Sequence, residues 1–191
     1  MTRGAEVGPD GELRCPWALS TPDYLTYHDD EWGRPIRNDN GLYERLTLEG
    51  FQSGLSWLTI LRKRENFRAA FAGFDVATVA GFGDADRERL LNDAGIVRHR
   101  GKIDAALTNA RAAVALNESL TELVWGFAPL GDPAKKTLDD VASQTPESRA
   151  LAKELKRRGF TFVGPTTAYA LMQAAGLVND HLVDCWVRER I

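Results

Sequence analysis

Two cysteines and two histidines are the first residues whose types could do chemistry. His181 and Cys185 stand four residues apart, which on a helix places both side chains on one face. Cys15 and His28 form a second pair, separated by twelve residues, near the start of the chain. Two thiolates and two imidazoles suit a tetrahedral Zn²⁺ ion, and four protein ligands would make that ion structural rather than catalytic. The pattern predicts one zinc ion joining the two ends of the chain, although the same residues are also compatible with simple packing in a core.

Aromatic rings and carboxylates gather in the N-terminal third. The segment LEGFQSGLSW (48–57) holds one carboxylate, Glu49, among apolar and small residues. A flat, positively charged base would stack on aromatic rings and form hydrogen bonds to such a carboxylate. The alternative is that the rings are core, but a buried carboxylate without a partner would then cost several kcal/mol. The candidate rings are Trp17, Tyr24, Tyr27, Trp32 and Trp57.

Residues 155–177 have the pattern of two helices joined by a tight turn. The first helix should end at Gly159 and the second should begin at Pro165, where proline needs no amide partner. Free amides at a helix N-terminus bind anions such as phosphate, so the pattern predicts a nucleic-acid contact or, alternatively, an ordinary corner between helices. The candidate DNA contacts in this hairpin are Arg158, Gly164, Thr166 and Thr167.

The elements that must position these residues are helical. Apolar residues recur with a helical period in most of the chain, and FTFV (160–163) is the only strand-like run. Residues 131–146 are expected to form a surface loop, and the polar, glycine-rich residues 1–14 a disordered tail. The sequence thus predicts an all-α fold, with helices over 56–71, 84–95, 101–119, 146–159, 166–176 and 180–189.

Composition limits the classes of protein that fit. The 191 residues carry a net charge of −3, and no apolar run reaches the roughly 18 residues that span a bilayer. Two distant cysteines fit a reducing cytoplasm, and nothing in the chain demands more than a monomer. Basic clusters at 62–64, 98–102 and 156–158 would favour nucleic-acid binding if they converge in space.

Five segments, in order along the chain, resemble the bacterial DNA-3-methyladenine glycosylase I family of the helix-hairpin-helix glycosylase superfamily. They are CPW (15–17), YLTYHDDEWGRP (24–35), LEGFQSGLSWLTILRKRENFR (48–68), DAGIVRHRGKI (93–103) and KRRGFTFVGPTTAYALMQAAGLVNDHLVDC (156–185). The resemblance implies a single helical glycosylase domain over 15–191, with the hairpin at about 147–176 and a zinc-binding terminal lobe of 15–40 plus 177–191. It also implies that Cys15, His28, His181 and Cys185 hold a structural zinc ion.

The resemblance also implies roles for the pocket residues. Glu49 would read the edge of the alkylated adenine, Tyr27 would add a hydrogen bond, and Trp57 would stack on the base. Trp17, Tyr24 and Trp32 would complete the wall, while Gly54 and Leu55 would probe the gap left in the duplex. Phe162 replaces the first glycine of the usual hairpin. Asp180 precedes a predicted zinc ligand, so we expect it to cap a helix or support the metal site rather than act in catalysis.

The implied activity is excision of N3-methylated adenine from double-stranded DNA, with free 3-methyladenine as product. The methylated base is cationic and leaves readily, so we expect a hydrolase that works without a lysine Schiff base; no lysine lies in 15–57. One rival is a damaged-DNA-binding module that releases no base. Another is a small-molecule enzyme on a helical scaffold, whose basic clusters would confer no salt-dependent affinity for DNA.

Overall fold

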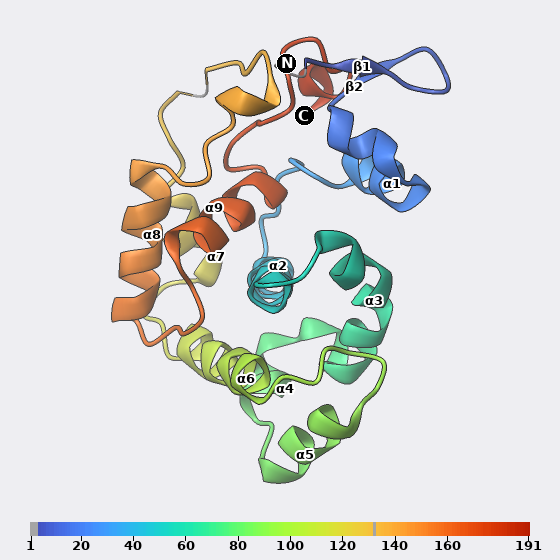
Figure 1. Cartoon of the computed structure of the whole chain (residues 1–191). Helices are drawn as coiled ribbons and strands as arrows, with labels where there is room; N and C mark the ends of the chain where they lie inside the picture. Colours follow the sequence, from blue (N-terminus) through green and yellow to red (C-terminus); the bar gives the residue numbers. More distant parts are fainter. Residues whose placement is uncertain (1–3, 132) are drawn as a thin grey trace.

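The protein is mostly helical in a computed structural model that describes residues 4–131 and 133–191. Within these ranges a two-stranded hairpin precedes the helices, and the C-terminal residues lie beside this hairpin at one end of the molecule (Figure 1). None of the described helices is long and apolar enough to cross a membrane. The elements are β1 (Glu6–Val7), β2 (Leu13–Arg14), α1 (Pro22–Asp30), α2 (Asp39–Gln52), α3 (Trp57–Ala70), α4 (Val76–Ala80), α5 (Asp84–Asn92), α6 (Arg100–Val114), α7 (Leu120–Trp125), α8 (Pro146–Arg157) and α9 (Pro165–Ala174).

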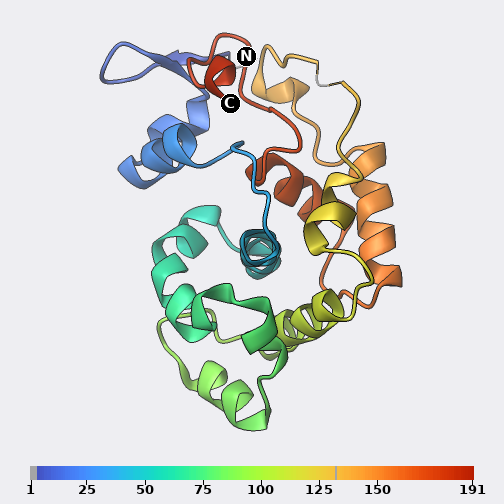
Figure 2. The same ribbon diagram turned by 180° about the vertical axis from the view of Figure 1, so that it is seen from behind.

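Helix α2 is the centre of the fold. Figures 1 and 2 show it end-on, with α3, α4, α6, α7 and α9 arranged around it. Its apolar residues are buried on several sides, as expected for a helix enclosed by others. The side chain of Asn38 accepts a hydrogen bond from the Gly41 amide at 2.7 Å and so fixes where the helix begins. At the other end, Nζ of the buried Lys102 donates to the carbonyl of Phe51 at 2.8 Å.

The predicted hairpin is formed by α8 and α9, which pack against each other. Thr145 and Ser148 cap the start of α8, and Gly159 has a φ of 93° where that helix ends. The amide side chain of Asn109 on α6 exchanges two hydrogen bonds, at 2.8 and 3.1 Å, with the backbone of Thr161. Phe162 has a φ of 58°, a left-handed conformation that glycine adopts more easily than a residue with a side chain.

The terminal lobe corrects the prediction of a disordered tail over residues 1–14. Residues 4–14 contain the hairpin of β1 and β2, while residues 1–3 lie outside the described residues. Arg14 is buried and its guanidinium binds the carboxylates of Asp10 and Asp29. These ion pairs attach the segment before Cys15 to α1, which the polar composition did not reveal.

One other local prediction was wrong. Residues 180–189 form turns and a short 3-10 helix, Arg188–Arg190, in place of the predicted helix. Residues 160–163 form the turn of the hairpin, as predicted. The remaining five predicted helices are present, each shorter by a few residues or shifted by one, and the described part of 131–146 is a loop with one 3-10 turn, Leu138–Asp140.

A close crossing between α9 and the terminal lobe makes glycine necessary at position 176. Gly176 has a φ of 75°, and a Cβ there would lie 2.6 Å from the carbonyl oxygen of Gly33 and 2.7 Å from the nitrogen of Pro35. We expect Gly176→Ala to lower the free energy of unfolding by about 2 kcal/mol or more, combining backbone strain with the clash. Thermal denaturation checks this, with Gly50→Ala as control, because a Cβ at Gly50 meets no atom within 4 Å. Equal stability of the two variants would contradict the expectation.

Candidate active site and metal centre

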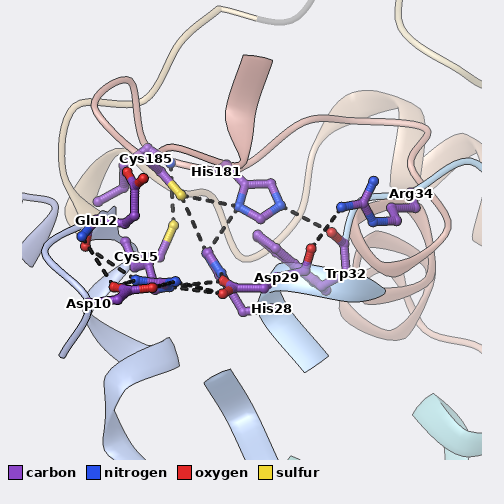
Figure 3. Close-up of polar contacts among 11 residues, drawn as sticks. Asp10, Glu12, Cys15, His28, Asp29, Trp32, Arg34, His181 and Cys185 are labelled. Atoms are coloured by element: carbon purple, nitrogen blue, oxygen red, sulfur yellow. Dashed lines mark hydrogen bonds and ion pairs between the residues drawn. The ribbon is translucent and has the colours of Figure 1, made fainter. Parts of the chain in front are cut away.

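The two cysteines and two of the histidines meet in one buried cluster between the chain ends. One ligand atom from each of Cys15, His28, His181 and Cys185 lies within 4.8 Å of all the others (Figure 3). Sγ of Cys185 is 3.5 Å from Nε2 of His28 and 3.6 Å from Nδ1 of His181, and these two nitrogens are 3.1 Å apart. Zinc bonds of about 2.3 Å to sulfur and about 2.05 Å to nitrogen, at the tetrahedral angle, place S and N about 3.5 Å and two N atoms about 3.3 Å apart. The cluster could therefore hold a metal ion.

Each histidine is oriented by the ring nitrogen that faces away from the cluster. Nδ1 of His28 is 2.7 Å from a carboxylate oxygen of Asp29, and Nε2 of His181 is 3.0 Å from the carbonyl oxygen of Trp32. These acceptors favour a proton on the outer nitrogen and leave the inner nitrogen free to bind a metal. A hydrogen bond from the Cys15 thiol lowers the pKa of the Cys185 thiol.

The pair His181 and Cys185 does not lie on one helical face, because the segment is not helical. Instead, the guanidinium of Arg188 donates to the carbonyls of Asn179 and His181 at 2.7 Å, which shapes a turn. The two side chains do lie together, as predicted, but a turn and not a helix brings them together.

Two tryptophan rings lie between the Cys/His cluster and a neighbouring cavity. The ring of Trp17 lies 5.1 Å from that of His28, and the ring of Trp32 lies 4.7 Å from that of His181. Trp17 and Trp32 pack edge to face, with ring centroids 5.1 Å apart. Both rings also line the cavity, so each histidine of the cluster is one contact away from it.

The cavity has a volume of about 420 Å³, within the range of small-molecule sites. It brings together every pocket residue that the sequence predicted, from α1, α2, α3 and the segments directly before and after α1. Its lining also includes residues from α9 and from the 131–146 loop. The lining residues are Trp17, Tyr24, Tyr27, Trp32, Glu49, Gln52, Trp57, Leu138, Val141, Ala170, Gln173 and Asp180.

Glu49 is a buried carboxylate that lacks a hydrogen-bond donor within the described residues. Its exposed fraction is 6%, and burial raises its pKa to about 8 despite the opposing charge of Arg45. Tyr27 lines the same cavity, and burial raises the pKa of its hydroxyl, which keeps it a neutral donor. One acceptor and one donor, both uncommitted within the described protein, therefore face the cavity.

Contacts among residues of α1 and α3 hold the aromatic rings that line the cavity in place. The rings of Tyr27 and Trp57 are tilted by 45° with centroids 5.4 Å apart. The hydroxyl of Tyr24 accepts the Leu58 amide at 2.9 Å, which holds α1 against the start of α3. This bond also keeps Trp57, the first residue of α3, at the cavity.

Sequence reasoning missed several lining residues. Gln52 follows Glu49 by three positions on α2, so helical spacing could have identified it. Leu138 and Val141 come from the loop, where no pattern pointed to the site. Asp180 reaches the cavity but caps no helix; its carboxylate accepts from Tyr169 at 2.6 Å and Gln173 at 2.8 Å and pairs with Lys135 at 2.8 Å.

Four of the predicted DNA contacts lie together next to Glu49. Gly54 and Leu55, between α2 and α3, face Thr166 and Thr167 of α9 across a second cavity of about 290 Å³ that Glu49 also lines. Gly54 has a φ of 80°, and a Cβ there would meet nothing within 4 Å. The side chain of Leu55 is 42% exposed, so it projects from the surface beside the pocket.

The three basic clusters do not converge. Residues 62–64 lie on α3 and residues 156–158 at the end of α8, on opposite sides of α2 (Figures 1 and 2). The cluster 98–102 does reach the hairpin, where the ring of His99 lies 6.3 Å from that of Phe162. Several of these cations are paired within the protein: Arg62 with Asp23, Arg64 with Glu31, and Arg158 with Glu154 and Glu118.

A helical hairpin beside an aromatic pocket, with an unpaired carboxylate in that pocket, is an arrangement suited to a DNA glycosylase, which takes a base out of the duplex into such a pocket. The sequence matches the family described as methyladenine glycosylase over residues 17–189. The chain belongs to this family.

Named relatives and solved structures cover nearly the whole chain. DNA-3-methyladenine glycosylase 1 of Escherichia coli (strain K12) is 49% identical over 177 residues, covering 90% of this chain and 95% of the relative. DNA-3-methyladenine glycosylase of Haemophilus influenzae is 43% identical over 178 residues, covering 90% and 96%. A crystal structure of 3-methyladenine DNA glycosylase I is 49% identical with a TM-score of 0.87, covering 91% and 98%. The Staphylococcus aureus enzyme, whose structure concerns 3-methyladenine recognition, is 34% identical with a TM-score of 0.87, covering 92% and 96%.

Glu49 should make stability depend on pH in a defined window. The folded protein holds this proton up to a pKa of about 8, whereas an unfolded glutamate has the ordinary value of 4.5. Folded protein therefore binds more protons between these values, and stability falls as pH rises, by about 1.4 kcal/mol per pH unit from this group. We expect the stability of Glu49→Gln minus that of wild type to increase from about pH 4.5 to 8 and then level off.

Urea denaturation of both proteins at a series of pH values checks this expectation. Every other titrating group is common to the two chains, so the difference isolates Glu49. A difference that stays flat over the window would show that Glu49 ionises in the folded protein as easily as in water.

Proposed function

We propose that this protein excises 3-methyladenine from alkylated double-stranded DNA by hydrolysing the N-glycosidic bond, leaving an abasic site. The relatives that carry this activity in their names support the proposal, as does the family. The observation that carries it is Glu49, a buried carboxylate without a donor, placed among aromatic rings in a cavity that a flat base could enter.

Charge explains how the pocket would select its base. Methylation at N3 makes the adenine cationic, and a cation is stabilised both by the faces of aromatic rings and by an ionised carboxylate. In the proposed complex Trp57 stacks on the flipped base, Glu49 accepts a hydrogen bond from its edge, and Tyr27 adds a second hydrogen bond. Trp17, Tyr24 and Trp32 close the wall. Neutral adenine offers no charge to offset the cost of ionising Glu49, so it would bind weakly.

The same charge makes the bond easy to break. The methylated base leaves as a neutral molecule, and water captures the sugar cation without a covalent enzyme intermediate. The lysines nearest the site are engaged: Lys102 donates to the carbonyl of Phe51, and Lys135 pairs with Asp180. Asp180 has three partners, which supports a role in holding the pocket wall rather than in activating water.

The hairpin side of the pocket would receive the DNA. Leu55, with Gly54 before it, would fill the space that the flipped nucleotide leaves, since it projects beside the cavity. The amides of Gly164, Thr166 and Thr167 at the start of α9 would bind a backbone phosphate, with Arg158 close to the end of α8. We propose a monomer acting on chromosomal DNA in the cytoplasm, since one chain supplies the whole pocket.

The metal cluster is proposed to hold one structural Zn²⁺ ion. Two thiolates and two imidazoles fill a tetrahedral shell, so the ion would supply stability and no reactive position. Cys15 and His28 come from the start of the chain, and His181 and Cys185 from its end. The ion would therefore close the terminal lobe against which Trp17 and Trp32 pack.

Release of free base from methylated duplex DNA tests the proposed activity. We expect wild type to release 3-methyladenine and Glu49→Ala to lose activity by about 100-fold or more, because the base would lose its only carboxylate partner in the pocket. Chromatography of the products under single-turnover conditions measures this loss. Glu65→Gln is the matched control on α3, since that glutamate is exposed and pairs with Arg68 outside the pocket.

Two results would contradict the proposal. Binding of methylated DNA without release of any base would favour a damaged-DNA-binding module. A covalent enzyme–DNA adduct trapped with borohydride would show that a lysine Schiff base takes part.

Metal analysis tests the zinc proposal. We expect one zinc ion per chain in wild type, and loss of the ion in Cys185→Ser together with a fall in melting temperature, because binding of a structural ion contributes directly to folding. His99→Asn should keep its zinc, since His99 caps α6 and lies outside the cluster. Zinc retained at full stoichiometry in Cys185→Ser would contradict the four-ligand site.

A further inference from the structure

Arg45 is a buried charged residue that the proposed reaction does not use. It lies on α2 one helical turn before Glu49, so the two side chains share a face of the helix. The side chain is 7% exposed, and its Nη1 is buried without a hydrogen-bond partner within the described residues. A buried charged donor left unpaired costs free energy, so its presence beside the pocket calls for an electrostatic reason.

Contacts from two other helices hold the guanidinium in place. Nη2 of Arg45 donates to Glu31 at 2.9 Å, and Glu31 also accepts from both terminal nitrogens of Arg64, at 2.6 and 2.7 Å. The guanidinium carbon of Arg45 lies 5.5 Å from the ring centroid of Tyr27, which lines the pocket. Two guanidinium groups face one carboxylate, so this cluster carries one formal positive charge in excess.

That excess charge lies next to the one unpaired carboxylate of the pocket. Asp180, the other carboxylate lining the cavity, is balanced by Lys135 at 2.8 Å, and Lys102 is bound to backbone carbonyls. Helix α9 contributes no charged side chain. The titratable and charged groups around Glu49 come from several segments. They are Tyr27 from α1, Glu31 directly after α1, Arg45 from α2, Arg64 from α3, Lys102 from α6, Lys135 from the loop before α8, and Asp180 after α9.

We propose that Arg45 is a positioning residue of the base pocket, supplying the counter-charge that allows Glu49 to ionise inside the closed cavity and meet a cationic base. The proposal deepens the proposed function and rests on it, because only a cationic base needs that carboxylate ionised. Burial raises the pKa of Glu49 to about 8, and the charge of Arg45 opposes this rise. Without that charge, more of Glu49 would be protonated at neutral pH.

A titration of Glu49 in the free protein tests the role directly. Carbon-13 NMR of labelled glutamate side chains follows each carboxyl group, and the signal absent from Glu49→Gln identifies Glu49. We expect Arg45→Met, which keeps the length of the side chain but not its charge, to raise the midpoint by about one pH unit, a tenfold change in proton affinity. Arg45→Lys should stay near the wild-type midpoint.

The pH profile of excision supplies a second readout. The methylated base in DNA carries its positive charge at every pH used. The increase of the excision rate with pH therefore reports on ionisation of the enzyme. In Arg45→Met we expect this increase to move to higher pH by the same amount, with the rate approaching that of wild type above the new midpoint. A purely structural role would lower the rate equally at all pH values.

Each outcome decides the proposal. An unchanged Glu49 midpoint in folded Arg45→Met would overturn it, and so would failure of both Arg45→Met and Arg45→Gln to fold, since Arg45 would then be a structural support. Failure of the proposed function is distinguishable, because wild type would release no 3-methyladenine whatever the titration shows.

Discussion

The burial of one unpaired carboxylate is the constraint on which the pocket depends. Glu49 lies on α2 with 6% of its surface exposed and no donor within the described residues. Taking such a group out of water costs several kcal/mol, and that cost must be offset by packing elsewhere. Helix α2 provides the packing, because Leu42, Leu46 and Phe51 are buried among the helices around it. The central helix can therefore carry a group that is unfavourable where it lies.

The Cys/His cluster and the pocket are in direct contact. Trp17 and Trp32 each pack against a histidine of the cluster with one part of the ring and line the cavity with another. The carbonyl of Trp32 also lies 3.0 Å from Nε2 of His181, which ties the backbone of the wall to the cluster. A displacement of either histidine would thus move a tryptophan ring that lines the pocket. This arrangement explains why the two chain ends meet beside the pocket and not at a remote surface.

An element could be predicted from the sequence where neighbouring residues determine its structure, and could not where contacts with residues distant in the sequence determine it. The bounds of α8 and α9 follow from adjacent signals, the cap at Thr145 and the Gly164–Pro165 start, so they were predicted closely. Residue types suggested that Cys15, His28, His181 and Cys185 belong together, and the structure brings them into one cluster that could hold a metal ion. The segment 180–189 has a helical period, but remote bonds such as that from the Leu182 amide to Cys15 Sγ impose turns there. Order in residues 4–14 likewise comes from ion pairs of Arg14, one of them fifteen residues away.

The two carboxylates that line the cavity differ in what they can still accept. Asp180 takes hydrogen bonds from Tyr169 and Gln173 and an ion pair from Lys135, so its lone pairs are committed to holding the wall. Glu49 has no such partners and faces the place where a base would lie. Binding of a cationic base would place a positive charge beside Glu49. The attraction between the two would offset part of the stabilisation that the carboxylate lost when it left water. Under the proposed function, the uncommitted carboxylate would select the base, and a base already activated by methylation would require less from the protein to leave.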